Sequence, residues 1–146
     1  MNYVLATSRP WNEVLACRLQ ERTGYTFHLI TKKDELTNEH LQNVNPRYIF
    51  LPHWSYIVPE EVFNAYECVI FHMTDLPYGR GGSPLQNLIQ RGHKETKISA
   101  LRCVKEMDAG PIYLKRQLCL EGSASEIFLR AAGIIEEMIE EIVREE

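Results

Sequence analysis

The sequence predicts an α/β fold: a single three-layer domain over residues 1–146, with helices on both faces of a mostly parallel, twisted sheet. The first observation is that stretches typical of strands and of helices alternate along the chain, which favours a parallel sheet covered on both faces. The second is the length of 146 residues, enough for one ordinary domain and too short for two. The third is a short turn between the last two predicted strands, which predicts that this pair is antiparallel.

The first half of the chain alternates short apolar strands with helical patterns. Strands are predicted at residues 3–7, 25–31, 47–52 and 68–72. Apolar residues spaced three or four apart predict a helix over residues 12–22 that ends at Gly24 and buries Val14, Leu15, Cys17 and Leu19. Thr37 suits the N-cap of a second helix, and Pro59 with the two glutamates after it suits the first turn of a third.

The second half begins with a Gly/Pro-rich loop at residues 79–82. Ser83-Pro84 would cap a helix that runs to about Gln90 and ends at Gly92. Strands at 97–104 and 112–120 flank a turn at 105–111. Ser123 would cap a closing amphipathic helix with one apolar and one acidic face, whose regular apolar side leaves a helix-mediated homodimer open. The apolar face would hold Ile127, Phe128, Ala131, Ile135, Met138, Ile139 and Ile142, and the other Glu136, Glu137, Glu140 and Glu141.

The composition excludes several function classes. The net charge is −4 and no basic cluster is longer than Lys32-Lys33, which argues against a nucleic-acid partner. No apolar run approaches the ~18–20 residues that cross a bilayer, so no membrane partner is predicted. No nucleotide-binding glycine motif follows the first strand. The four cysteines are widely spaced, which predicts buried free thiols in a reducing, cytoplasmic compartment; they are Cys17, Cys68, Cys103 and Cys119. The histidines His28, His40 and His93 lie at unrelated places, so no metal site is predicted.

The stretch from Ile70 to Pro111 carries the candidate chemistry. The apolar run before His72 places this histidine at the end of a buried strand, and Asp108 lies in the turn at 105–111. In open α/β sheets, ligands bind at the carboxyl ends of the strands, and an imidazole and a carboxylate brought together there suit proton transfer. Taken singly, His72 also fits a histidine satisfied inside the core, and Asp108 fits a residue that closes a turn before Gly110.

Four motifs in this region are similar to those of a known family. The chain carries I-F-H-M-T-D-L-P at 70–77, R-G-G-S-P-L-Q at 80–86, D-A-G-P-I at 108–112 and, between them, Gly92, Glu95, Thr96 and Ser99. In order and spacing they resemble N-x-H-x-S-L-L-P, a Gly-rich loop with P-x-Q, D-x-G-P-I and G-x-x-x-T-x-x-T of the folate-dependent formyltransferases. That family includes glycinamide ribonucleotide, methionyl-tRNA and amino-sugar formyltransferases. The resemblance covers about residues 47–118, and the N-terminal third agrees only in its strand–helix rhythm.

The resemblance implies transfer of a formyl group from 10-formyltetrahydrofolate, the co-substrate, to the amine of a small substrate. His72 would be the acid/base group, and Asp108 would orient it and favour its charged form. Ile70 stands where the family has an asparagine that hydrogen-bonds the oxyanion, and losing one such donor commonly costs about 10²–10³ in turnover. The candidates to replace it are Thr74, Asn87 and a backbone N–H of the 79–82 loop, which includes Gly81.

The resemblance also implies ligand contacts outside the catalytic pair. Arg80 would anchor a phosphate or carboxylate of the amine substrate, with a solvated loop charge as the alternative. Folate would contact the loop at 55–57, for which a generic loop is the alternative, and the strand end near the last turn. The residues are Ser55, Tyr56, Ile57, Arg102, Cys103, Val104 and Met107. By analogy with the family, the acceptor would be an amino sugar or nucleotide sugar. Two alternatives remain: a catalytically weakened ligand-binding domain, and a formyl hydrolase that passes the group to water.

Overall fold

The computed structural model describes residues 1–76 and 88–145 of the chain. It divides into two compact units, Met1–Ile70 and Phe71–Glu146. Most of the helix predicted between Ser83 and Gln90 lies outside the described residues, although 88–90 are helical. The prediction of one domain over residues 1–146 stays a prediction.

The first unit is built on parallel strands. β1 (Asn2–Ala6) pairs on one side with β2 (Thr26–Ile30) and on the other with β3 (Ile49–Leu51), and β3 pairs with the start of β4 (Cys68–His72). The interior strands are almost continuously apolar, which is the pattern expected when both faces of a parallel sheet are buried. The ring of Tyr3 stacks on that of Phe27 at 5.0 Å between centroids, which joins β1 to β2.

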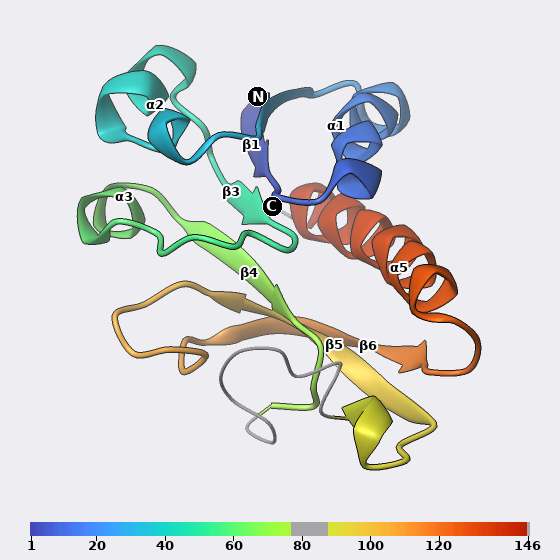
Figure 1. The fold of residues 1–146 in the computed structure, drawn as a ribbon. Helices are drawn as coiled ribbons and strands as arrows, with labels where there is room; N and C mark the ends of the chain where they lie inside the picture. The colour runs from blue at the N-terminus through green and yellow to red at the C-terminus, as the bar shows by residue number, and fades with distance from the viewer. Residues whose placement is uncertain (77–87, 146) are drawn as a thin grey trace. The chain divides into compact units, whose positions relative to one another are not determined.

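Helices cover both sides of these strands. α1 (Pro10–Thr23) lies on one side of β1 and β3, and α2 (Asn38–Val44) and α3 (Glu60–Ala65) lie on the other (Figure 1). A 3-10 turn, Lys33–Glu35, precedes α2 and was not expected from the sequence. The predicted cap is confirmed, because the Thr37 hydroxyl accepts a hydrogen bond from the backbone N–H of His40 at 3.2 Å.

The buried face of α1 differs from the predicted one. Val14 is 53% exposed and Cys17 is also exposed, whereas Asn12 is fully buried. The buried positions are spaced by three, one and three residues, so they form one helical stripe on which Val14 and Cys17 do not fall; they are Asn12, Leu15, Ala16 and Leu19. The apolar criterion failed at position 12 because this amide is buried with hydrogen-bond partners.

The second unit contains an antiparallel hairpin and a long helix. β5 (Glu95–Arg102) pairs with β6 (Ile112–Cys119), and the register shifts between Ala100 and Leu101. α5 (Ala124–Arg144) packs on this hairpin. Its N-terminus carries the predicted cap as a full capping box: Ser123 accepts from the N–H of Glu126, whose side chain accepts from the N–H of Ser123.

One acidic residue of α5 lies on the wrong side for the predicted pattern. Glu136 is buried, at 2% exposure, within the stripe that also holds Ala132, Ile135 and Ile139. Glu137 is exposed as expected, and Phe128, predicted to be buried, is half-buried. Position 136 follows Ala132 by four residues and precedes Ile139 by three, so the helix period places it with the apolar side chains.

The hydrogen-bonded strand order is β2-β1-β3-β4-β5-β6, with parallel pairs among β1 to β4 and the antiparallel pair β5–β6. This confirms the predicted fold class. All four cysteines are free; Cys68 is buried and Cys103 half-buried, but Cys17 and Cys119 are exposed, contrary to expectation. Within 1–76 and 88–145, no helix is long and apolar enough to cross a membrane.

Candidate active site

His72 and Asp108 meet in the second unit. His72 is the last residue of β4, and Asp108 lies in the turn between β5 and β6. The Nδ1 atom of His72 is 3.5 Å from Oδ2 of Asp108, and each side chain is only 8% exposed. Two residues that are 36 positions apart in sequence therefore form a buried imidazole–carboxylate pair, which is an arrangement suited to proton transfer.

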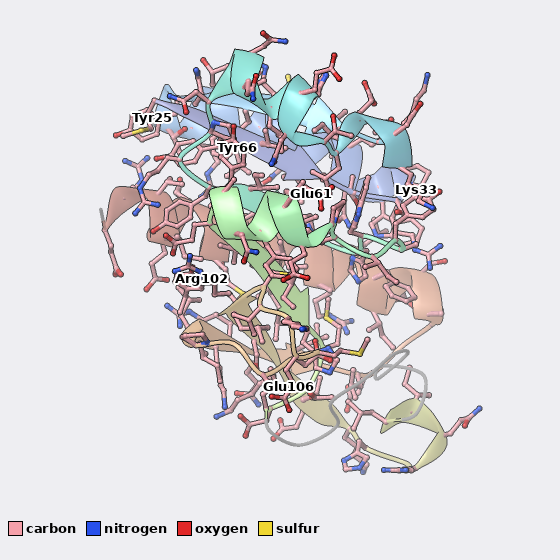
Figure 2. The ribbon with its side chains drawn as sticks, turned by 90° about the vertical axis from the view of Figure 1, so that its left-hand side faces the viewer. Tyr25, Lys33, Glu61, Tyr66, Arg102 and Glu106 are labelled. Carbon is pink, nitrogen blue, oxygen red and sulfur yellow. The ribbon has the colours of Figure 1, made fainter. Side chains whose placement is uncertain are left out.

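The turn that carries Asp108 is tightly closed. Asp108 has a backbone φ of 53°, in the left-handed region that Asp adopts more readily than most residues. A Cβ atom at Gly110 would lie 1.8 Å from the carbonyl oxygen of Arg102, so only glycine fits there. The backbone N–H of Arg102 donates to the carbonyl of Pro111 at 2.9 Å. Arg102, at the end of β5, and Glu106, within the turn, are labelled in Figure 2.

Cys103 is a third ionisable group near this pair. Burial raises the pKa of its thiol, and the neighbouring Asp108 carboxylate raises it further, so the sulfur carries its proton at neutral pH. The sequence placed Cys103 among the folate contacts but gave no sign that its thiol lies near Asp108, because that proximity depends on how the turn folds back.

Thr74 combines complete burial with an unused hydroxyl. Its exposure is 0%, and in the described part of the chain its Oγ1 atom has no hydrogen-bond partner. Leaving a buried polar group unpaired costs about 1–3 kcal/mol, so such a group calls for an explanation. The side chain of Ile70, where the family motif has its asparagine, has no hydrogen-bond donor.

The residues that follow His72 are held by side chains of the hairpin. Thr96 Oγ1 donates to the carbonyl of Met73 at 3.2 Å, and Ser99 Oγ donates to that of Thr74 at 2.7 Å. Lys115 Nζ donates to the carbonyl of Leu76 at 2.8 Å and to the Asp75 carboxylate at 2.5 Å. These four hydrogen bonds, from Thr96, Ser99 and Lys115, are called the 73–76 clamp. Sequence reasoning missed the clamp, although Asp75, in place of the motif's leucine, was a signal.

A family model described as formyl transferase matches residues 13–126. The chain belongs to the formyltransferase family. A methionyl-tRNA formyltransferase from Thermotoga neapolitana is 36% identical over 94 residues, which cover 63% of this chain and 29% of that protein. The chain thus spans less than a third of the length of this relative.

Two solved structures agree with the fold. The structure of a methionyl-tRNA formyltransferase from Clostridium thermocellum matches with a TM-score of 0.95 and 51% identity, over 99% of this chain and 65% of that one. HypX from Aquifex aeolicus, solved in complex with tetrahydrofolic acid, matches with a TM-score of 0.80 and 22% identity, over 98% of this chain and 26% of that one. The second likeness shows the fold alone.

The remaining residues predicted for a formyltransferase site lie in several places. In the first unit, Ser55 donates its backbone N–H to Ser8 Oγ at 2.9 Å, and Ile57 is 90% exposed. The Tyr56 ring lies 5.9 Å from the Nζ of Lys33, which is labelled in Figure 2. In the second unit, Cys103 and Val104 are half-buried, and Arg102 and Met107 are exposed. Arg80, Gly81 and Asn87 lie outside the described residues.

His53, in the first unit, has a neutral imidazole. Its Nδ1 atom is 3.0 Å from Nδ2 of Asn12, whose amide also approaches the oxygens of Thr7 and Pro52, so the amide is the donor and Nδ1 the acceptor. Burial, and then the charge of Arg9, lower the pKa of His53 to about 4. Among residues 1–76 and 88–145, no group of His, Cys, Asp and Glu side chains could hold a metal ion.

Proposed function

We propose that this chain transfers the formyl group of 10-formyltetrahydrofolate to an amine, with His72 and Asp108 as the catalytic pair. The observation that carries the proposal is the 3.5 Å approach of His72 Nδ1 to Asp108 Oδ2 in a buried setting. Further support is the family match over residues 13–126, a range that contains both side chains. Folate supplies the formyl group, and the chain's own residues handle protons and charge.

The chemistry requires one proton to move from the attacking amine to the departing folate nitrogen. The amine nitrogen forms a bond to the formyl carbon, the carbonyl electrons move to oxygen, and collapse breaks the carbon–nitrogen bond to folate. Asp108 lies against Nδ1 and holds the ring orientation, so Nε2 is the nitrogen that we assign to the proton exchange. The carboxylate also stabilises the imidazolium that forms when His72 takes the proton.

We assign the hydrogen bond to the oxyanion to Thr74. Ile70 stands where the family motif has its asparagine and cannot donate. Thr74 is two residues after His72 and has a buried hydroxyl with no hydrogen-bond partner among the described residues. A donor that is already desolvated and uncommitted is suited to the charge that develops in a transition state.

Two acceptor classes have specific support. The net charge of −4 supports a small amine, such as that of an amino sugar or nucleotide sugar, because polynucleotide binding ordinarily needs a basic surface. The identity of 51% to a methionyl-tRNA formyltransferase supports an aminoacyl amine instead. Both acceptors are primary amines, so the pair His72–Asp108 serves either in the same way.

The experiment is an assay of tetrahydrofolate release from 10-formyltetrahydrofolate with each acceptor, with products identified by mass spectrometry. Wild type should give formylated amine, whereas His72→Asn and Asp108→Asn should each lose about 10²–10⁴ in turnover. His28→Gln, on the exposed face of β2, is the matched control and should behave like wild type. Normal turnover in both site variants would rule out the mechanism, and formate as the product would assign the hydrolase.

A second candidate is a ligand-binding domain that has lost its chemistry, and Ile70 is the observation that favours it. The variant Ile70→Asn restores the residue of the family motif. Activity that appears only in this variant supports the binding domain. Activity that is already present in wild type and unchanged in Ile70→Asn supports a donor elsewhere, as assigned to Thr74.

A further inference from the structure

The segment after His72 depends on the β5–β6 hairpin for its position. Residues 73–76 belong to no strand, yet the carbonyls of Met73, Thr74 and Leu76 each accept a hydrogen bond from a hairpin side chain. The clamp residues Ser99 and Lys115 are directly opposite each other in the hairpin register, so their side chains lie on the same face.

The same hairpin also carries the other half of the catalytic pair. Its turn contains Asp108, and side chains of its strands form hydrogen bonds to the segment 73–76 that follows His72. The separation of His72 from Asp108 is therefore set through one element, by the closed turn on one side and by the clamp on the other. A clamp residue can affect the reacting groups in this way without touching a substrate.

We infer that Lys115 is a positioning residue, which fastens residues 73–76 to the hairpin and so keeps His72 opposite Asp108 and the Thr74 hydroxyl in place. Its catalytic consequence rests on the proposed function. Lys115 makes two of the four clamp bonds, one to the Leu76 carbonyl and one to the Asp75 carboxylate. The hydrogen bond from Lys115 also lowers the pKa of Asp75, so this carboxylate is ionised at neutral pH.

Kinetics of three variants separate positioning from a purely structural role. Lys115→Met removes both bonds, and we expect kcat to fall by about tenfold to a hundredfold, the cost of a small misplacement of reacting groups. The KM for the folate donor should change by less than about twofold, since no ligand contact is removed. Asp75→Leu keeps the bond to Leu76 and should lose less, and Lys115→Arg should recover most of the activity.

Arg116→Met is the matched control. Arg116 is next to Lys115 on β6; its guanidinium pairs with Glu141 of α5 and donates to the backbone carbonyl of Lys115 at 2.7 Å, but it makes none of the clamp bonds. The two ion pairs are comparably exposed, and exposed pairs contribute little to stability, so both variants should melt within about 4 °C of wild type. Only Lys115→Met should change kcat. Equal losses of kcat in both variants would overturn the proposal.

A second readout does not depend on turnover. In a ¹H–¹⁵N spectrum of the imidazole rings, the His72 signals are assigned by their loss in His72→Asn. They should move in Lys115→Met and stay in Arg116→Met. Signals that coincide with wild type in Lys115→Met would overturn the positioning role, even if kcat falls. Shifted signals in a protein whose wild type transfers no formyl group would sustain the positioning role and refute the proposed function.

Discussion

His53, which is half-buried, and the buried Asn12 form a polar pair in which the imidazole is neutral. The backbone at His53 has a φ of 56°, which a histidine adopts more easily than a β-branched residue. The Nδ1 atom of its ring accepts a hydrogen bond from the side-chain amide of Asn12. Because burial opposes protonation, the ring carries no charge at neutral pH. Protonation of this residue should therefore oppose folding.

Stability should fall with acidification in a window that His53 defines. The pKa is about 4 in the folded chain and 6.5 in the unfolded chain, so the unfolded state binds more protons between these values. The contribution is fully present above pH 6.5 and is lost as the pH falls to 4, by about 3 kcal/mol in total. Urea unfolding at several pH values measures this slope.

The variant His53→Asn should flatten that slope, because asparagine does not titrate and tolerates the left-handed backbone. His40→Gln, which changes an exposed histidine, should leave the slope as in wild type. An unchanged slope in His53→Asn would mean that another group is responsible.

Thr74→Val tests the unused hydroxyl. Valine keeps the shape of threonine and removes a buried group without a described partner, so the free energy of unfolding should stay level or rise. If Thr74 stabilises the oxyanion, turnover should nevertheless drop by about 10²–10³. Thr26→Val, on the exposed part of β2, is the control for the substitution itself. A loss of stability with normal turnover would contradict the assignment.

At the scale of residues, the sequence is informative where a motif fixes the order of side chains. The approach of His72 to Asp108 was foreseeable because His72 ends one predicted strand, Asp108 lies in the turn after another, and both match one family pattern. The burial of Asn12 and Glu136 was not, since a polar side chain becomes buried only when distant residues pack around it. The bond between Lys115 and Asp75 was not predicted from the sequence for the same reason, because the two residues are 40 positions apart.

At the scale of elements, two glycines differ in the space that a Cβ atom would find beside them. Gly110 lies against the carbonyl oxygen of Arg102, whereas Gly133, inside α5, has open space where a Cβ would be. Gly110→Ala should destabilise the chain by about 1–3 kcal/mol and disturb Asp108. Gly133→Ala should stabilise it by about 0.5–1 kcal/mol, because alanine favours a helix interior. Urea unfolding compares the two, and equal effects would contradict this difference.

Most elements could be placed from the sequence. The strand Cys68–His72 is confirmed residue for residue, and the caps at Thr37 and Ser123 are confirmed, because these signals are local. The 3-10 turn Lys33–Glu35 is too short to leave a periodic pattern. The shift of register between Ala100 and Leu101 depends on the partner strand, so it has no signature in one strand alone.

At the scale of the whole molecule, the sequence predicted the class of sheet but not the two compact units. Their boundary falls between Ile70 and Phe71, inside β4. Linkers are usually recognised by glycine, proline or charge, and this boundary lies in a continuous apolar run. Composition therefore gave no signal there.

The net charge leads to a prediction about the acceptor. Transfer to a small amine should vary by less than about twofold between roughly 50 and 200 mM salt, because few ions are displaced on binding. A polynucleotide acceptor held by several phosphate contacts would lose about a thousandfold in affinity over the same range. Steady-state rates with both acceptors across this range of salt decide between them. A steep loss would contradict the small-amine prediction.

The position of β6 at the end of the strand order has a consequence for solubility. In the described ranges no strand pairs with the outer edge of the segment Ile112–Cys119, so the backbone groups along this edge could pair with another chain. Its only charges are Lys115 and Arg116, and cationic side chains are a common means by which proteins prevent edge-to-edge aggregation. A variant in which uncharged residues replace Lys115 and Arg116 would keep its core and become prone to form intermolecular β-sheet.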